Sequence, residues 1–100
     1  MTHNLDLEFE EILNKTCNFF KLEKKVLLGK CRKREIADAR HMLYKYTHEA
    51  GFKCYYISEK IGKRNHSTVS SGIKTLNQLL NNTGLLKKIY SEYKEHIEEK

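Results

Sequence analysis

Apolar residues recur at three- and four-residue steps along most of this chain, the pattern of helices that bury one face. The first such segment runs from Leu5 to Phe20, and a short one follows from Glu23 to Leu28 and stops at Gly29. A long segment from Ile36 to Ala50 is closed by Gly51, a residue suited to the left-handed position that ends helices. We expect this third segment to be the central core helix.

The second half of the chain predicts a short helix, a turn and a longer helix. The short helix runs from Tyr55 to Ile61 and stops at Gly62, and the turn consists of residues 63 to 65. Asn65 suits the N-cap position, because its side-chain oxygen can accept a hydrogen bond from a backbone amide of the next turn. The helix that it opens has a core stripe made of Val69, Ile73, Leu76 and Leu80.

A last helix is predicted from Gly84 to Lys100, packing on the domain or on a partner. Its apolar spacing is given by Leu85, Ile89, Tyr93 and His96/Ile97. The chain has no proline and only five glycines in 100 residues, so few positions break regular structure. We therefore expect one all-α domain over residues 1–100, compact and built from five to six helices.

Charge is unevenly divided along the chain, whose formal net charge is +6. The first 14 residues hold four acids and no lysine or arginine, whereas residues 15–34 hold eight bases against Glu23 alone. Residues 51–80 add a further +4. A surplus concentrated in two stretches is typical of a protein that binds a polyanion, since each neutralised phosphate releases counterions.

The outer face of the helix after Asn65 is polar, small and hydrogen-bonding, with few salt-bridging pairs. It carries His66, Ser67, Ser70, Ser71, Lys74 and Thr75, with Thr68 near the leading end. A short helix, a glycine turn and a longer helix of this kind form the helix-turn-helix plan, whose second helix enters the major groove of DNA. The basic turn of Lys63 and Arg64 would then face phosphate.

Other classes of function find little support in the sequence. Cys17, Cys31 and Cys54 are too widely spaced for a disulfide framework or a zinc site, so we expect no metal and a reducing cytoplasm. Cys54, His48 and Glu49 could be combined into a catalytic triplet, but we expect no enzyme, no cofactor and no small-molecule substrate. No apolar run is long enough for a membrane span, and the acidic N-terminus is unlike a signal peptide.

Residues 64–69, Arg-Asn-His-Ser-Thr-Val, resemble a signature of the DNA-binding C-terminal domain of the bacterial replication initiator DnaA. Upstream, residues 34–44 look like that domain's arginine-led central helix, and residues 57–62 look like its first helix-turn-helix element. The likeness covers about residues 9–80 in the same order, with the helix at about 84–99 as an addition. It implies an all-α fold of the DnaA C-terminal, Trp-repressor-like type.

The resemblance also implies which residues bind DNA. Arg34 matches an arginine that enters the minor groove, and residues 65 to 68 match those that read major-groove bases and anchor phosphates. The predicted DNA-binding residues are Arg32, Arg34, Arg40, Lys63, Arg64, Asn65, His66, Ser67, Thr68, Ser71 and Lys74.

Three departures from the family pattern bear on specificity. Asn65 replaces an aspartate, Lys63 a glycine, and Ser71 stands where a second histidine usually occurs. Because asparagine pairs naturally with adenine and aspartate with cytosine, the base that residue 65 prefers is open.

We expect a stand-alone protein that binds a short double-stranded DNA site in the cytoplasm, as a regulator or accessory factor of replication or transcription. The chain lacks the Gly-x-x-x-x-Gly-Lys-Ser/Thr loop of the initiator's ATPase, so we do not expect an ATP-driven initiator. The alternative is an interaction module that keeps the fold, binds DNA weakly or not at all, and holds a protein partner or a second copy through its terminal helices.

Overall fold

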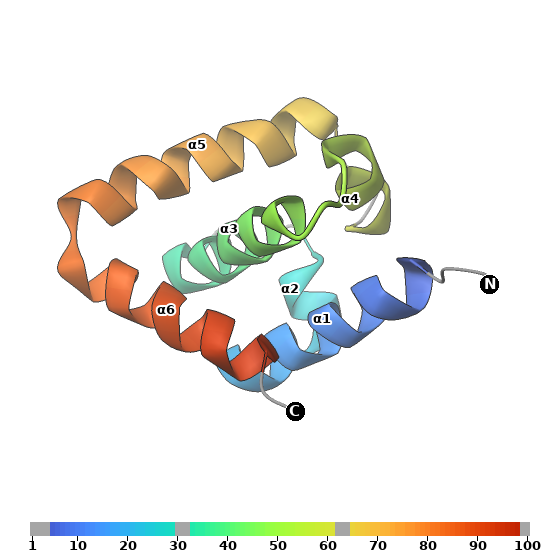
Figure 1. The fold of residues 1–100 in the computed structure, drawn as a ribbon, viewed down its shortest axis with the longest axis horizontal. Helices are drawn as coiled ribbons and strands as arrows, with labels where there is room; N and C mark the ends of the chain where they lie inside the picture. The colour runs from blue at the N-terminus through green and yellow to red at the C-terminus, as the bar shows by residue number, and fades with distance from the viewer. Residues whose placement is uncertain (1–4, 30–32, 62–64, 99–100) are drawn as a thin grey trace.

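The computed structural model describes residues 5–29, 33–61 and 65–98, and all regular structure in these ranges is α-helical (Figure 1). The helices are α1 (Leu5–Phe20), α2 (Lys24–Leu27), α3 (Arg34–Glu49), α4 (Cys54–Lys60), α5 (His66–Asn82) and α6 (Gly84–Glu98). The all-α prediction is thus confirmed. No helix among the described residues is long and apolar enough to cross a bilayer.

Local chemistry ends the helices where the sequence predicts. Gly51 has a φ of 110°, and its amide donates to the carbonyl of His48, which closes α3 as expected of a left-handed glycine. At the start of α5, the Asn65 side chain accepts from the amide of Ser67 at 3.0 Å, so the predicted N-cap is confirmed. Lys21, which ends α1 with a φ of 57°, was not predicted in that conformation.

The helices enclose two apolar clusters. One cluster joins α1, α2, α3, α4 and the start of α5, and its buried members are Phe9, Leu13, Leu27, Ala39, Leu43, Tyr44, Phe52, Ile57, Ile61 and Val69. The second lies under α6 and consists of Met42, Leu76, Tyr90, Tyr93 and Ile97. Ile12 and Phe20 pack against both clusters, so α1 connects them.

α3 is the central helix, as predicted, and α5 crosses it where a glycine replaces a side chain. A Cβ atom on Gly72 would lie 2.9 Å from the rings of both His41 and Tyr44. Gly72 therefore lets the backbone of α5 lie directly against these two rings of α3. The core stripe predicted for α5 is present, with Val69 and Leu76 buried and Ile73 and Leu80 partly buried.

α6 folds back on the domain after a connection of one residue, Thr83 (Figure 1). Its buried face agrees with the prediction at Tyr93 and Ile97 but not at Leu85, which is 70% exposed, and it also includes Tyr90. The buried Thr16 Oγ1 of α1 lies 2.7 Å from the Tyr93 hydroxyl on this face. Leu85, in the first turn of α6, faces solvent instead.

Candidate nucleic-acid interface

α4 and α5 form the two helices of the predicted helix-turn-helix. Ile57 in the middle of α4 and Ile61 just after its end are fully buried, and both pack in one cluster with Val69 of α5. This contact fixes α5 on α4 through its inner face, so the opposite face of α5 points outward. The turn between the helices, with the predicted contacts Lys63 and Arg64, lies outside the described residues.

The leading end of α5 presents the predicted reading residues to solvent. Asn65, His66, Ser67 and Thr68 are all exposed, as are Ser71 and Lys74 one and two turns later. The whole helix contains no acidic residue. Its first turn therefore offers the positive end of the helix dipole and small polar side chains together, an arrangement suited to a polyanion.

The cap limits what Asn65 can offer a base. Its side-chain oxygen accepts from the amide of Ser67 at 3.0 Å and from the hydroxyl of Ser67 at 2.9 Å. An amide oxygen has two lone pairs, so in this conformation Asn65 has only its amide N–H groups left for other partners. The two-sided pairing of asparagine with adenine would require this oxygen to leave its cap.

A second basic surface lies at the start of α3. Lys33 is the N-cap residue and Arg34 the first residue of this helix, and both side chains are exposed. Arg32, the remaining predicted contact of this run, lies outside the described residues.

Arg40 differs from its predicted place on the basic surface. Its side chain is buried, with a residue exposure of 7%. Nε donates to the carbonyl of Leu27 at 2.8 Å, and Nη2 donates to that of Gly29 at 3.0 Å. Because these carbonyls end α2, the planar guanidinium holds α2 to α3 just before the basic run of residues 30–34. The sequence pattern does not distinguish this interior role from a surface contact.

The acidic first helix neutralises two lysines of neighbouring helices. Asp6 accepts from Lys60 of α4 at 2.9 Å and also from the Tyr56 hydroxyl, while Glu10 pairs with Lys24 of α2. The hydrogen bonds from Tyr56 and Lys60 lower the pKa of Asp6 despite partial desolvation. Desolvation and the Asp6 bond raise the pKa of Tyr56 to about 12. Asp6 thus connects α1 to α4, and Glu10 connects α1 to α2.

Of the three residues considered as a catalytic triplet, Cys54 and His48 lie close together, whereas Glu49 has other partners. The Sγ of Cys54 lies 3.8 Å from Nδ1 of His48, but that nitrogen also lies 3.3 Å from the carbonyl oxygen of Phe52. Glu49 instead contacts Lys45 and Tyr90. Within the described ranges, no three His, Cys, Asp or Glu side chains gather as metal ligands would.

Comparisons with known proteins agree with this geometry. The sequence model of a family described as the bacterial DnaA protein helix-turn-helix matches residues 9–76. The chromosomal replication initiator protein DnaA of Pseudothermotoga lettingae is 33% identical over 85 residues, which cover 84% of this chain and 19% of that protein. The protein of the same name from Bacteroides fragilis is 34% identical over 68 residues, or 67% of this chain and 14% of that protein. α6 begins after the last residue that the family matches.

Proposed function

This chain belongs to the bacterial DnaA helix-turn-helix family, and from that premise we propose that it binds double-stranded DNA in a sequence-specific manner through α5. Membership in the family supports DNA binding in general. The finer claim is that α5 lies in the major groove with its first turn at the base edges.

The observation that carries the proposal is the division of α5 into two faces. Val69, Gly72 and Leu76 are buried against the domain, while the four residues from Asn65 to Thr68 are exposed around a capped helix start without an acidic neighbour on the helix. A solvated helix would usually carry salt-bridging pairs on such a face. Small polar side chains instead allow close approach to DNA.

Each predicted residue except the buried Arg40 has a role in this proposal. His66 and Thr68 read base edges, and Asn65 donates an N–H to a base acceptor while its oxygen stays in the cap. Ser67, Ser71 and Lys74 anchor phosphates along α5, and Arg34 enters the minor groove from the start of α3. Arg32, Lys63 and Arg64 contact the backbone from the two basic segments.

The biological use that we propose is regulation of replication or transcription, or an accessory role at a replication origin. The relatives are named chromosomal replication initiator proteins, and the chain spans only 19% and 14% of their lengths. Chromosomal DNA as the partner would place the protein in the cytoplasm.

A second candidate function is binding of a protein partner, favoured by apolar side chains near the start of α1. Leu5, Leu7 and Tyr55 are 45%, 65% and 61% exposed, and Leu5 and Tyr55 line a groove of about 380 Å³ between α1 and α4. Exposed patches of this kind often mark interaction sites. Salt dependence separates the two functions, because affinity for duplex DNA falls steeply with rising salt only if phosphates are bound.

Selection of bound duplexes from a random pool tests the reading role of α5. His66→Ala should leave the fold intact and reduce the ratio of specific to non-specific affinity about tenfold, since a lost base contact costs about 1–3 kcal/mol. Asn65→Asp keeps a capping oxygen and should shift the preference at one base pair toward cytosine.

The matched control for His66→Ala is His96→Ala, in the last turn of α6 and away from the start of α5 (Figure 1). The control should select the same sequences as the wild type. Identical selection profiles for wild type, His66→Ala and Asn65→Asp would contradict sequence reading by α5.

A further inference from the structure

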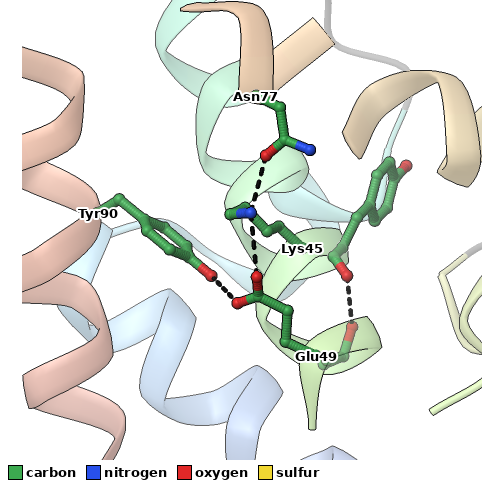
Figure 2. Close-up of polar contacts among 6 residues, drawn as sticks. Lys45, Glu49, Asn77 and Tyr90 are labelled. Atoms are coloured by element: carbon green, nitrogen blue, oxygen red, sulfur yellow. Dashed lines mark hydrogen bonds and ion pairs between the residues drawn. The ribbon is translucent and has the colours of Figure 1, made fainter. Parts of the chain in front are cut away.

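A polar network connects the second half of α5 to both α3 and α6 (Figure 2). Lys45 of α3 donates to Asn77 of α5 at 2.7 Å and pairs with Glu49 one turn later at 3.0 Å. The Tyr90 hydroxyl of α6 donates to the other carboxylate oxygen of Glu49, also at 3.0 Å. We call these four residues, Lys45, Glu49, Asn77 and Tyr90, the Lys45 network.

The network fixes the direction in which the Lys45 side chain points. Its ammonium lies between two acceptors from different helices and 5.7 Å from the centre of the Tyr90 ring (Figure 2). Only 15% of the Lys45 side chain is exposed, against 48% of Glu49. Burial alone would raise the pKa of Glu49, but hydrogen bonds from Lys45 and Tyr90 and the charge of Lys94 lower it, so the carboxylate stays ionised at neutral pH.

The contact at Gly72 divides α5 into two arms. At this point the backbone of α5 lies against the rings of His41 and Tyr44. With a rise of about 1.5 Å per residue, His66 lies about 9 Å along the helix on one side and Asn77 about 7.5 Å on the other. A rotation of α5 about Gly72 therefore moves Asn77 and His66 by similar amounts in opposite directions.

We propose that the Lys45 network sets the tilt of α5 about Gly72 and so positions His66 and Thr68 against the base edges of bound DNA. The four residues of the network are positioning residues, because Asn77 contacts Lys45 of α3 and lies away from the leading end of α5. Tyr90 makes α6, which lies beyond the family match, part of the DNA-reading apparatus. The inference deepens the proposed function and rests on it.

The physical case depends on precision rather than on stability. Partly exposed ion pairs contribute little to the free energy of unfolding, so the network can be altered without unfolding the protein. Base contacts need donor and acceptor within a few tenths of an ångström, and a displacement of about 1 Å at a functional group is costly. A small change of tilt should therefore weaken reading while phosphate contacts, which tolerate more movement, persist.

The test uses two network variants and two matched controls. Asn77→Ala removes the acceptor on α5, and Gln78→Ala alters its exposed neighbour. Tyr90→Phe removes the hydroxyl bond to Glu49, and Tyr46→Phe removes another tyrosine hydroxyl bond between α3 and α6, to Glu98, that does not reach α5. Residual dipolar couplings of backbone amides measure the orientation of α5 relative to α3 without DNA, and affinities are measured for the selected and a random duplex.

We expect both network variants to reorient α5 and to lower the ratio of selected to random affinity roughly three- to tenfold, as for the partial loss of one base contact. The controls should match the wild type, and thermal midpoints should stay close in all five proteins.

Unchanged couplings in Asn77→Ala overturn the proposal whether or not the protein binds DNA. So does a changed tilt with an unchanged affinity ratio, or a lower salt slope in Asn77→Ala, which would make Asn77 a phosphate contact. A wild type without preference among duplexes would overturn the proposed function, and the couplings would still decide whether the network sets the tilt.

Discussion

Arg40 and His41 are consecutive residues of α3 that both bring polar groups toward the interior. Arg40 is satisfied by the carbonyls of Leu27 and Gly29. His41 lies against Gly72, and its buried Nδ1 has no hydrogen-bond partner among the described residues. The two side chains therefore respond differently to substitution and to pH.

Replacing Arg40 should affect stability more than it affects DNA contacts. Arg40→Lys keeps the charge but cannot supply two nitrogens in one plane, so buried carbonyls lose donors and unfolding becomes easier by about 1–3 kcal/mol. Arg34→Ala, at an exposed position, should change stability by less than about 0.5 kcal/mol. Urea unfolding measures both.

For the salt dependence of DNA binding, the Arg34 substitution should have the larger effect and the Arg40 substitution the smaller one. Arg34→Ala should reduce the slope by about one unit, because one positive charge is lost from the DNA interface, whereas Arg40→Lys should keep the wild-type slope. An Arg40→Lys protein of normal stability with a reduced slope would return Arg40 to the DNA-binding surface.

Stability should fall as the pH drops below the ordinary pKa of histidine. Burial lowers the pKa of His41 below its ordinary value of 6.5, and Arg40 adds to the effect against the charge of Asp38. Below pH 6.5 the unfolded chain thus binds a proton that the folded protein takes up only at lower pH, so protonation favours unfolding. Thermal midpoints of wild type and His41→Gln between about pH 7.5 and 5 measure this loss. Parallel curves for the two proteins would exclude His41 as its source.

At the scale of the element, α5 combines a good start with an unfavourable middle. Asn65 caps its first turn, but Gly72 lies in the interior, where glycine costs about 0.5–1 kcal/mol relative to alanine. The close approach to α3 explains the glycine, since a Cβ there would meet two rings at 2.9 Å. Packing between helices has outweighed helix propensity at this residue.

Gly72→Ala should therefore destabilise the protein although alanine favours helices. Overpacking costs about 1–3 kcal/mol, and the propensity gain offsets part of it, which leaves a net loss of about 1–2 kcal/mol. Gly84→Ala is the control, because a Cβ at Gly84 meets nothing within 4 Å, and it should be neutral or stabilising. Denaturant midpoints compare the two, and a stabilised Gly72→Ala protein would refute the close approach.

At the scale of the whole molecule, α6 and α1 hold the two apolar clusters together. Lys15 of α1 donates to the carbonyl of Ile97 at 2.9 Å, and Thr16 meets the Tyr93 hydroxyl. Ile12 and Phe20 of the same helix contact both clusters. The helix-turn-helix is thereby coupled to α6 through α1 and α3.

Tyr93→Ala should destabilise the entire domain in one transition. The ring is fully buried, so its removal should cost about 3–5 kcal/mol, a large part of a typical domain's 5–15 kcal/mol. Because shared side chains join the clusters, far-UV and near-UV circular dichroism should give the same midpoint. Two separate transitions, with the helix-turn-helix unfolding later, would show that the clusters are independent.

The sequence by itself determined the helices and the face of α5 that points outward. Capping, glycine termination and apolar periodicity act within a few residues, so Leu5–Phe20, the cap at Asn65 and the end at Gly51 agree with the structure. The exposure of Ser67, Ser71 and Lys74 follows from the same periodicity, because a helix that buries Val69 and Leu76 must turn the other side to solvent.

Only the tertiary structure decided what lies across from each helix. The sequence predicted Arg40 as a surface base, but its partners lie in α2, and it predicted Leu85 as buried, but α6 packs through Tyr90, Tyr93 and Ile97. The Lys45 network joins residues from three helices. Such contacts depend on which helices meet and at what angle, and the packing of whole helix surfaces fixes that, not the local pattern of any one segment.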